Sequence, residues 1–324
     1  MARDGTPILS RPAVRFLLII LIIAALPIGG GIFLLHRITH PVRDRTEFNP
    51  EDLMLRTEEV TFDAADGVLL SGWMVRGAPG SPVIILAHDL GGSRYSMVNS
   101  AVSLNRAGYP LFVFDLRGHG RSSGRGSSLG VDEKHDLLGA VAYLKTRKDV
   151  DGSRLGVWGV GMGAYAAVLA AAEVPEIAAL ALDAVYPDVP AQLDRLVKSR
   201  IPPAFHFVVP GVRLLYNPYF GFHHSKGNSV SGTIDRLSGR NVLFIAALDA
   251  PERHAEEQLL YAALPDNPAG EQNFLELRAS GISGLYAEDK KTYDAAIVTF
   301  FRTYLGRSSR SGAQAQPPIQ VLER

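Results

Sequence analysis

The chain has 324 residues, of which 47% are hydrophobic and 20% are charged, which suits one large α/β domain with appended segments or two smaller domains. Its 33 basic residues balance 33 acidic residues, so the overall charge gives no reason to expect a nucleic-acid partner. The chain contains no cysteine, which excludes disulfides, thiolate metal sites and a cysteine nucleophile.

The N-terminus carries an apolar stretch of membrane-spanning length. Residues 16–35, FLLIILIIAALPIGGGIFLL, hold no charged side chain and are about as long as a bilayer core is thick. A cleaved signal peptide is the alternative, but this stretch exceeds the usual apolar region of such peptides and no clear A-x-A cleavage site follows it. We therefore predict an uncleaved, single-pass membrane anchor preceded by an N-terminal segment, 1–15. Arginines flank the stretch on both sides, so the side of the membrane stays open.

An α/β pattern follows a predicted polar linker at residues 36–56. Alternating stretches at 58–64 and 68–75 flank Asp66-Gly67, which is typical of a β-hairpin. Continuous apolar runs, typical of strands covered on both faces, then lie at 82–88, 110–116, 154–159, 177–183, 241–247 and 273–279. Amphipathic stretches of helical length lie between them, at 95–107, 131–145, 162–173, 252–263 and 288–304. Over residues 57–305 this alternation predicts a mostly parallel sheet flanked by helices.

One interval interrupts the alternation. No buried strand is expected over residues 184–240, which are rich in proline and contain the aromatic run PAFHFVVPGVRLLYNPYFGFHH. An insertion of this length in a compact domain is typical of a lid with short helices of its own. Its aromatic side chains are compatible with contact to a membrane surface, but we favour packing over the open end of the sheet. The Ser-, Gln- and Pro-containing tail, 306–324, is predicted to be disordered.

The stretch GVWGVGMGAY, Gly156–Tyr165, fits two motifs. Gly159, Gly161 and Ala164 form G-x-G-x-x-A, a dinucleotide-binding pattern, and Asp183 follows at the spacing of the acidic residue that holds a ribose hydroxyl. The same stretch fits the nucleophile elbow G-x-S-x-G of a serine hydrolase, with Gly161 at the serine position. The first motif predicts an NAD(P)-binding oxidoreductase, and the second predicts a hydrolase fold without its nucleophile.

The surrounding loops favour the hydrolase motif. LAHDLGGSR, residues 86–94, is similar to the H-G-x-G-G oxyanion loop of α/β-hydrolases, with Asp89 in place of the first glycine. FDLRGHGRSSG, residues 114–124, resembles the loop after the fourth strand of that family, and DGSRLGVWGVGMGA, residues 151–164, resembles its passage into the elbow. Over residues 58–305 the chain thus resembles the α/β-hydrolase fold superfamily, and in particular its dienelactone-hydrolase-like and serine-aminopeptidase-like members. The resemblance implies an α/β-hydrolase fold and no cofactor.

The resemblance also implies a Ser-His-acid triad, whose positions are degenerate in this chain. Gly161 stands at the nucleophile and Ile282 at the base, and neither side chain can perform that chemistry. The acid position falls on Ala250; Asp249, one residue earlier, is either a displaced acid or an exposed carboxylate that caps the next helix. Asp183, at the end of the preceding predicted strand, is a second candidate for a relocated acid.

The oxyanion site consists of backbone N–H groups, so it can outlast the triad. By resemblance, Leu90 and Met162 supply these donors, and Met162 begins a helix whose N-terminus favours an anion. With His88 and Asp89 on the same loop, they form the predicted site for a small acyl or carboxylate ligand. His88 and His119 are expected to have structural roles, and no metal-binding motif is present in the sequence.

The sequence therefore predicts a membrane-anchored α/β-hydrolase-fold protein without serine-hydrolase activity, which acts by binding a ligand or a partner. The alternative is an active hydrolase of esters, lactones or amides with a non-standard site. An NAD(P)-dependent oxidoreductase is the third interpretation. The sequence leaves the protein partner and the oligomeric state open.

Overall fold

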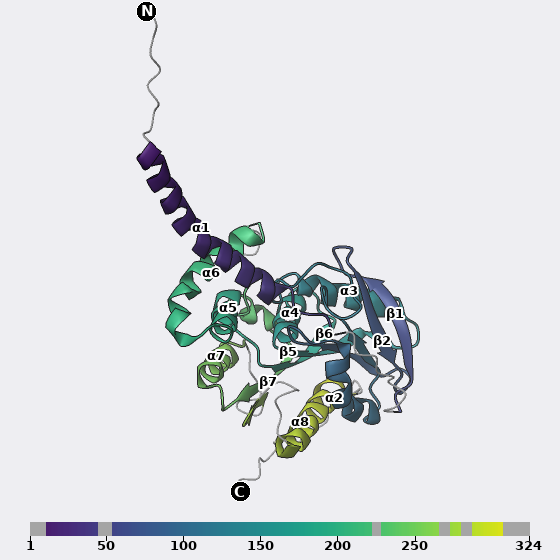
Figure 1. The fold of residues 1–324 in the computed structure, drawn as a ribbon. Coiled ribbons are helices and arrows are strands. Elements are labelled where there is room, and N and C mark those ends of the chain that lie inside the picture. The colour runs from purple at the N-terminus through teal and green to yellow at the C-terminus, as the bar shows by residue number, and fades with distance from the viewer. Residues whose placement is uncertain (1–10, 45–53, 222–227, 266–272, 280–286, 307–324) are drawn as a thin grey trace, which may run out of the picture. The chain divides into compact units, whose positions relative to one another are not determined.

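The computed structural model describes residues 11–44, 54–221, 228–265, 273–279 and 287–306 (Figure 1). The contacts divide the chain into two compact units. We call residues 1–38 with 192–225 the helical unit, and residues 39–191 with 226–324 the sheet unit. The position of Ile282 and the tail after Gly306, which was predicted to be disordered, lie outside the described residues.

The sheet unit is built on an eight-stranded sheet with the order β1-β2-β4-β3-β5-β6-β7-β8. The strands are β1 (Thr57–Asp63), β2 (Leu69–Val75), β3 (Pro82–Ala87), β4 (Leu111–Phe114), β5 (Asp151–Val160), β6 (Ile177–Asp183), β7 (Asn241–Ala247) and β8 (Phe274–Leu277). β1 and β2 form the predicted antiparallel hairpin, and β2 pairs antiparallel with β4. Every pair from β4 through β3 to β8 is parallel, as the continuous apolar runs predicted.

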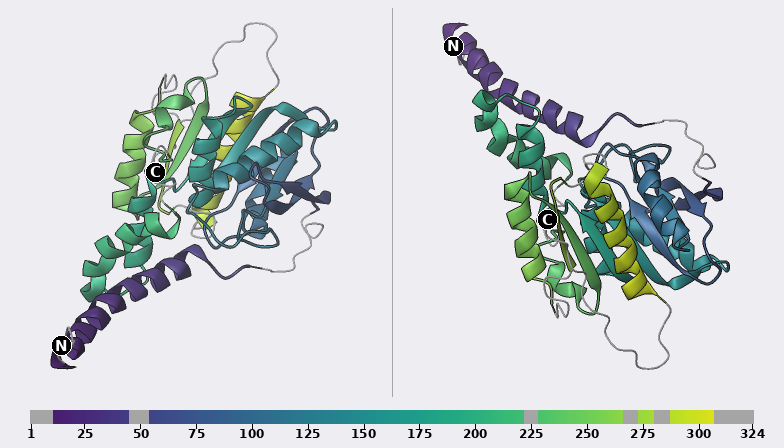
Figure 2. Two further views of the ribbon diagram at one scale, coloured as in Figure 1. Left: turned by 90° about the horizontal axis from the view of Figure 1, so that it is seen from above. Right: turned by 90° about the horizontal axis from the view of Figure 1, so that it is seen from below.

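Helices cover both faces of this sheet. They are α2 (Arg94–Arg106), α3 (Glu133–Thr146), α4 (Met162–Ala171), α7 (Pro251–Ala262) and α8 (Ala287–Leu305), close to the bounds that the amphipathic stretches predicted. α2 and α8 contact each other on one face, and α3 and α4 contact each other on the other face (Figure 2). Every residue of α4 is buried, which explains why this helix is apolar all round rather than on one stripe.

The interval 184–240 contains short helices, as its composition predicted. They are α5 (Val189–Lys198), the 3-10 helix η2 (Pro203–Val208), α6 (Val209–Tyr219) and the 3-10 helix η3 (Ile234–Leu237). Prolines stand at the first turns of η2 and α6, where the missing N–H group costs no helical hydrogen bond. No strand occurs among the described residues of this interval. Whether the interval acts as a lid stays a prediction.

The helical unit begins with α1 (Arg11–Thr39). Within it, Val14–Thr39 has a mean hydropathy of 2.8 and is long and apolar enough to cross a membrane, a test that a signal sequence near an N-terminus also passes. Large apolar side chains such as Phe16, Leu21 and Leu26 are exposed in the first half of the helix. In the second half, positions spaced by one and two helical turns are buried: Gly31, Leu35 and Ile38. Only the second half therefore packs against protein.

The prediction of a polar linker over residues 36–56 is wrong in its first part. α1 continues through this point to Thr39, which is fully buried. Its carbonyl accepts a hydrogen bond from the backbone N–H of Ser127 at 2.7 Å. We call residues 39–44 the strap, because they pack on loops of the sheet unit. Residues 45–53 lie outside the described part of the chain.

Candidate functional site

The turn between β5 and α4 has the backbone shape of a nucleophile elbow. Gly161 adopts φ +52° and ψ −110°, in the left-handed half of conformational space that glycine enters at little cost. A Cβ on Gly159 would lie 2.6 Å from the Cα of Ala164, and a Cβ on Gly163 would overlap the carbonyl oxygen of Ala87. Close approach of strand and helix therefore excludes side chains at residues 159 and 163. The sterics of an elbow are retained without a serine.

The carboxylate of Asp89 occupies the space next to Gly161. Asp89 lies on the loop after β3, and a Cβ built on Gly161 would overlap the Cγ and both oxygens of its side chain. The side chain of a nucleophile at residue 161 would begin at that Cβ. The Asp89 carboxylate therefore stands where the nucleophile of a serine hydrolase would stand, and the two departures from the family motifs form a single structural feature.

The donors of the predicted oxyanion site bind this carboxylate. The backbone N–H of Met162 donates to Asp89 Oδ1 at 2.8 Å, and the nearby backbone N–H of Leu90 favours the ionised form of the Asp89 carboxyl group. The N-terminus of α4 adds a favourable dipole for negative charge at this point. Sequence reasoning grouped Leu90, Met162 and Asp89 as residues that would bind a ligand together. In the structure, the Asp89 side chain is itself bound by the N–H of Met162.

Two opposing effects act on the Asp89 carboxyl group. Burial raises the pKa of Asp89 above its usual value, although the hydrogen bond from the Met162 N–H and the nearby N–H of Leu90 oppose this rise. The positive charge of Arg253, on α7, opposes it as well. Sequence reasoning missed Arg253. The available signal was a basic residue three positions after Ala250, in the segment where the family places its acid.

His88 is fully buried and engaged at both ring nitrogens. Nδ1 donates to the carbonyl of Asp89 at 2.8 Å, and Nε2 accepts from the backbone N–H of Leu116 at 3.0 Å. Burial, aided by the neighbouring ring of His119, lowers the pKa of His88 to about 3. The ring is therefore neutral at physiological pH and offers no nitrogen to a ligand or a proton.

His119 joins the loops that follow β3 and β4. Its Nε2 accepts from the backbone N–H of Gly91 at 3.1 Å, and its Nδ1 donates to the carbonyl of Arg117 at 2.8 Å. The ring centroids of His119 and His88 are 5.0 Å apart. Burial lowers the pKa of His119 as well. Like His88, it holds backbone in place and has no ring nitrogen left for proton transfer.

Asp183, the candidate for a relocated acid, is fully buried at the end of β6. It accepts a hydrogen bond from the hydroxyl of Tyr293 at 2.7 Å, and that hydroxyl accepts one from Trp158 Nε1 at 3.2 Å. The carbonyl of Asp183 also accepts the backbone N–H of Gly161 at 2.8 Å. Asp183 thus ties the elbow to the neighbouring strand while its side chain bonds to α8.

The other acid candidate, Asp249, is exposed after β7, and its N–H donates to the carbonyl of Arg278 at 3.0 Å. The prediction that Asp249 caps the following helix is wrong, because Ala250 is the N-cap residue of α7 and no side chain caps it. Pro251 occupies the first helical position instead, and it has no N–H group that needs a partner.

The geometry does not favour a dinucleotide or a metal ion. A pyrophosphate at the glycine turn would need the N–H of Met162, which already donates to a carboxylate, and two anions would then face each other. Among the described residues, no group of three or more His, Asp or Glu side chains could hold a metal ion.

The strap borders the loop that carries Asp89. Arg43 donates to the carbonyls of Ser122 and Gly124 at 2.6 and 2.5 Å, both in the loop after β4. Ser93, which precedes α2, donates its hydroxyl to Asp44 at 2.8 Å. The segment that leaves α1 is therefore fixed along two loops of the candidate site. Sequence reasoning missed this, since the acceptors are mostly backbone carbonyls.

Comparison with known proteins agrees with this geometry. The family model described as the alpha/beta hydrolase fold matches residues 82–205, from β3 to η2. The chain has the α/β-hydrolase fold. An uncharacterised protein of Mycobacterium tuberculosis is 32% identical over 122 residues, which cover 37% of this chain and 43% of that protein. A thiohydrolase of Arthrinium phaeospermum is 29% identical over 124 residues, which cover 37% of this chain and 40% of that protein.

Solved structures match a larger share of this chain than the curated relatives do. An esterase from Pyrococcus furiosus has a TM-score of 0.62 at 21% identity, with 83% of this chain and 99% of that chain covered. A dienelactone hydrolase from Anabaena variabilis has a TM-score of 0.55 at 18% identity, with 78% and 99% covered. At these identities the likeness establishes the fold alone. The matches to the two curated relatives span less than half of the length of each.

Proposed function

We propose that this protein is a membrane-anchored member of the α/β-hydrolase fold superfamily that lacks serine-hydrolase activity and acts by binding. The observation that carries the proposal is the Asp89 carboxylate next to Gly161, in the space of the missing nucleophile. Serine hydrolysis needs a nucleophile, a base and free donors for the oxyanion. Each of the three requirements meets an obstacle.

A nucleophile cannot arise from Gly161, which has no side chain. The two histidines on the loops after β3 and β4, His88 and His119, use both ring nitrogens on the backbone. The resemblance assigns the base to Ile282, which has no titratable group. The N–H of Met162 binds Asp89. Since losing a single oxyanion donor costs on the order of 10²–10³ in kcat, the combined losses support an inactive site.

The membrane anchor rests on α1. Its apolar stretch is long enough to span a bilayer, and the described side chains of its first half include large exposed apolar ones such as Phe16, Ile19 and Leu21. In water these side chains would form an unusually large apolar surface. A single-pass membrane location follows from this proposal.

Binding at the elbow involves competition with Asp89. A small acyl or carboxylate ligand would need the N–H groups of Met162 and Leu90, and the Met162 N–H already donates to the Asp89 side chain. Such a ligand binds only when the Asp89 side chain moves aside. A ligand that donates a hydrogen bond to Asp89 has no such competitor.

An active hydrolase with a non-standard site is the second candidate. The favouring observation is that a carboxylate, a group capable of base or nucleophile chemistry, stands at the nucleophile position. The likeness to proteins named thiohydrolase and esterase agrees with this candidate. In this case Asp89 would be essential for turnover.

One assay distinguishes the two candidates. The full chain, purified in a mild detergent, is incubated with short and long acyl esters, thioesters, lactones and amino-acid amides, beside an Asp89→Asn variant. We expect both proteins to show no turnover above that of the heat-denatured protein. Turnover by the wild type that Asp89→Asn abolishes would overturn the proposal and establish the second candidate. An Asp235→Asn variant, altered at an exposed carboxylate of η3, is the matched control.

A further inference from the structure

The part of α1 that precedes its contacts with η2 and α6 is shorter than a bilayer is thick. These contacts begin at Pro27, and from Phe16 to Leu26 the helix has 11 residues, which at 1.5 Å per residue extend about 16 Å. The hydrocarbon core of a bilayer is about 30 Å thick. A spanning α1 must therefore place the residues after Pro27 in the hydrocarbon as well. Those residues pack against other parts of the helical unit.

Contacts within the helical unit show which elements would enter the membrane with α1. A Cβ on Gly31 would lie 2.7 Å from Leu215 Cδ1 and 3.8 Å from Val212 Cγ2, so α6 approaches α1 closely at this glycine. One to two turns later, His36 Nδ1 and the hydroxyl of Tyr219 are 2.9 Å apart. Small residues allow such close approach between helices in membranes. α6 therefore accompanies the second half of α1.

The exposed side chains of η2 and α6 fit a hydrocarbon environment. Phe205 is 54% exposed, Phe207 is 76% exposed and Leu214 is 77% exposed. The expectation that the aromatic run packs over the sheet is wrong for these two phenylalanines, although Tyr216 is buried. Large exposed apolar side chains are unfavourable in water and favourable in the acyl region of a lipid leaflet.

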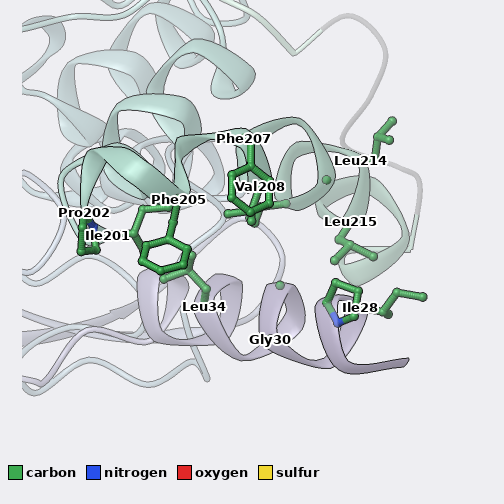
Figure 3. A pocket seen from close by; sticks show the side chains of 14 residues that line it. Ile28, Gly30, Leu34, Ile201, Pro202, Phe205, Phe207, Val208, Leu214 and Leu215 are labelled. Carbon is green, nitrogen blue, oxygen red and sulfur yellow. The ribbon is translucent and has the colours of Figure 1, made fainter. Parts of the chain in front are cut away.

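An apolar groove of about 680 Å³ lies between α1 and the elements η2 and α6 (Figure 3). Its walls include Ile28 and Leu34 of α1, Phe205 and Val208 of η2, and Leu215 of α6. None of its lining residues is charged. Gly30 and Gly211 also line it, and a Cβ on either would meet no atom within 4 Å. The absence of side chains at these two glycines helps to keep the groove open.

Basic residues dominate the polar parts of the same unit. Residues 27–38 and 192–221 contain one acidic residue, Asp194, and the basic residues Arg37, Arg195, Lys198, Arg200 and Arg213. Arg213 pairs with Asp194, its Nε donating to Oδ1 at 3.1 Å. Arg37 follows the apolar stretch of α1, and Lys198 and Arg200 shortly precede η2. The whole chain is electrically balanced, so this local positive excess marks the unit as one that attracts anionic headgroups.

We propose that this groove holds an acyl chain of an anionic phospholipid from the leaflet that α6 enters. The apolar walls would take the chain, and the basic residues would favour a negatively charged headgroup. This inference rests on the membrane anchor of the proposed function. It adds the class of ligand and assigns it to the helical unit rather than to the elbow.

The test uses a groove-filling substitution and its neighbour on the same helix. Gly30→Leu places a side chain in the groove, whereas Gly29→Leu adds the same side chain at a position outside the lining, where a Cβ likewise meets no atom within 4 Å. Gly211→Leu fills the groove from α6. Each full-length protein is extracted in mild detergent, mixed with equal amounts of phosphatidylglycerol and phosphatidylcholine, and analysed by native mass spectrometry.

We expect one retained phosphatidylglycerol per chain in the wild type and in Gly29→Leu, and at least a tenfold lower occupancy in Gly30→Leu and Gly211→Leu. Equal occupancy in all four proteins, or retention of phosphatidylcholine instead, would overturn the proposal. If the wild type is a dimer and the Gly30→Leu and Gly211→Leu variants are monomers, a second copy of the chain fills the groove, which would also overturn the proposal.

Alkaline carbonate extraction separates this failure from failure of the anchor. A chain that stays in the membrane but retains no lipid contradicts only the groove, whereas a chain that leaves the membrane contradicts the anchor.

Discussion

At the scale of single residues, Gly161 and Asp89 depend on each other. A serine at residue 161 would overlap the Asp89 carboxylate and would also hold a side chain at a positive φ. We expect Gly161→Ser to lower the free energy of unfolding by about 1–3 kcal/mol, from overpacking and backbone strain. Asp89→Gly in the same chain should restore part of that loss. Urea denaturation of the wild type, both single variants and the double variant measures the coupling. Additive effects would contradict the overlap.

His88 should make stability depend on pH in a defined window. The folded protein holds the pKa of His88 at about 3, whereas the ordinary value is 6.5. Between these pH values the unfolded chain binds a proton that the folded chain does not bind. Stability therefore falls as the pH is lowered from 6.5 towards 3, by up to about 1.4 kcal/mol per pH unit from this group.

His88→Gln tests this window, because a glutamine can accept from the N–H of Leu116 but does not titrate. The variant is expected to be less stable at pH 7, yet its stability should fall less steeply with acidification below pH 6.5. Parallel curves for the two proteins would mean that His88 is protonated in the folded state. The comparison uses slopes, so a general loss of stability does not affect it.

The sequence predicted several residues of the candidate site but not their arrangement. Gly161, Leu90 and Met162 were identified because motifs fix the order of elbow and oxyanion loop along the chain. The role of Asp89 was not visible. Its side chain accepts a hydrogen bond from a donor, the Met162 N–H, that lies 73 residues later in the chain, and no periodicity or spacing in the sequence reveals that pairing. Arg253 escaped for the same reason, since its effect on Asp89 acts through space.

At the scale of elements, the strap gives a testable contact. Arg43 donates two hydrogen bonds to carbonyls of the loop after β4. Hydrogen bonds from a charged donor contribute about 1.5–3 kcal/mol each. We therefore expect Arg43→Ala to increase amide hydrogen exchange at residues 39–44 and at residues 122–127 by at least tenfold. Val42→Ala, at a side chain that is 84% exposed, is the control and should exchange as the wild type does. Unchanged exchange in Arg43→Ala would show that the Arg43 side chain does not hold the strap.

The strands and helices of the sheet unit could be predicted closely, whereas the path of the strap could not. Continuous apolar runs and amphipathic stretches are local properties of the sequence, and each gave an element near its observed bounds. The strap has no such pattern. The strap is held in place by hydrogen bonds to the carbonyls of Ser122 and Gly124 and by the burial of Thr39. Its composition is like that of any polar segment of similar length, so the sequence does not reveal these contacts.

At the scale of the whole molecule, the anchor can be tested by charge. Val14–Thr39 has the hydropathy of a membrane span, and a charged residue near the centre of such a helix costs about 2.5–3.5 kcal/mol. The wild type should remain in the membrane pellet after alkaline carbonate extraction. Replacing Ile19, Ile20 and Leu21 together by aspartate should move the chain to the supernatant. Leu259→Asp, at an exposed apolar side chain of α7, should stay in the pellet. A wild type found in the supernatant would refute the anchor.

The overlap between residues 161 and 89 also limits the order in which this chain and a serine-bearing ancestor could have been connected by mutation. An aspartate at residue 89 overlaps a side chain at residue 161 in this geometry, so we expect the loss of the serine to precede or accompany its arrival. In the reverse direction, a serine regained at residue 161 collides with Asp89 before any activity can return. Once both changes are present, each protects the other from reversal. Relatives that carry Asp89 should therefore carry Gly161, while relatives with Gly161 alone represent the earlier step.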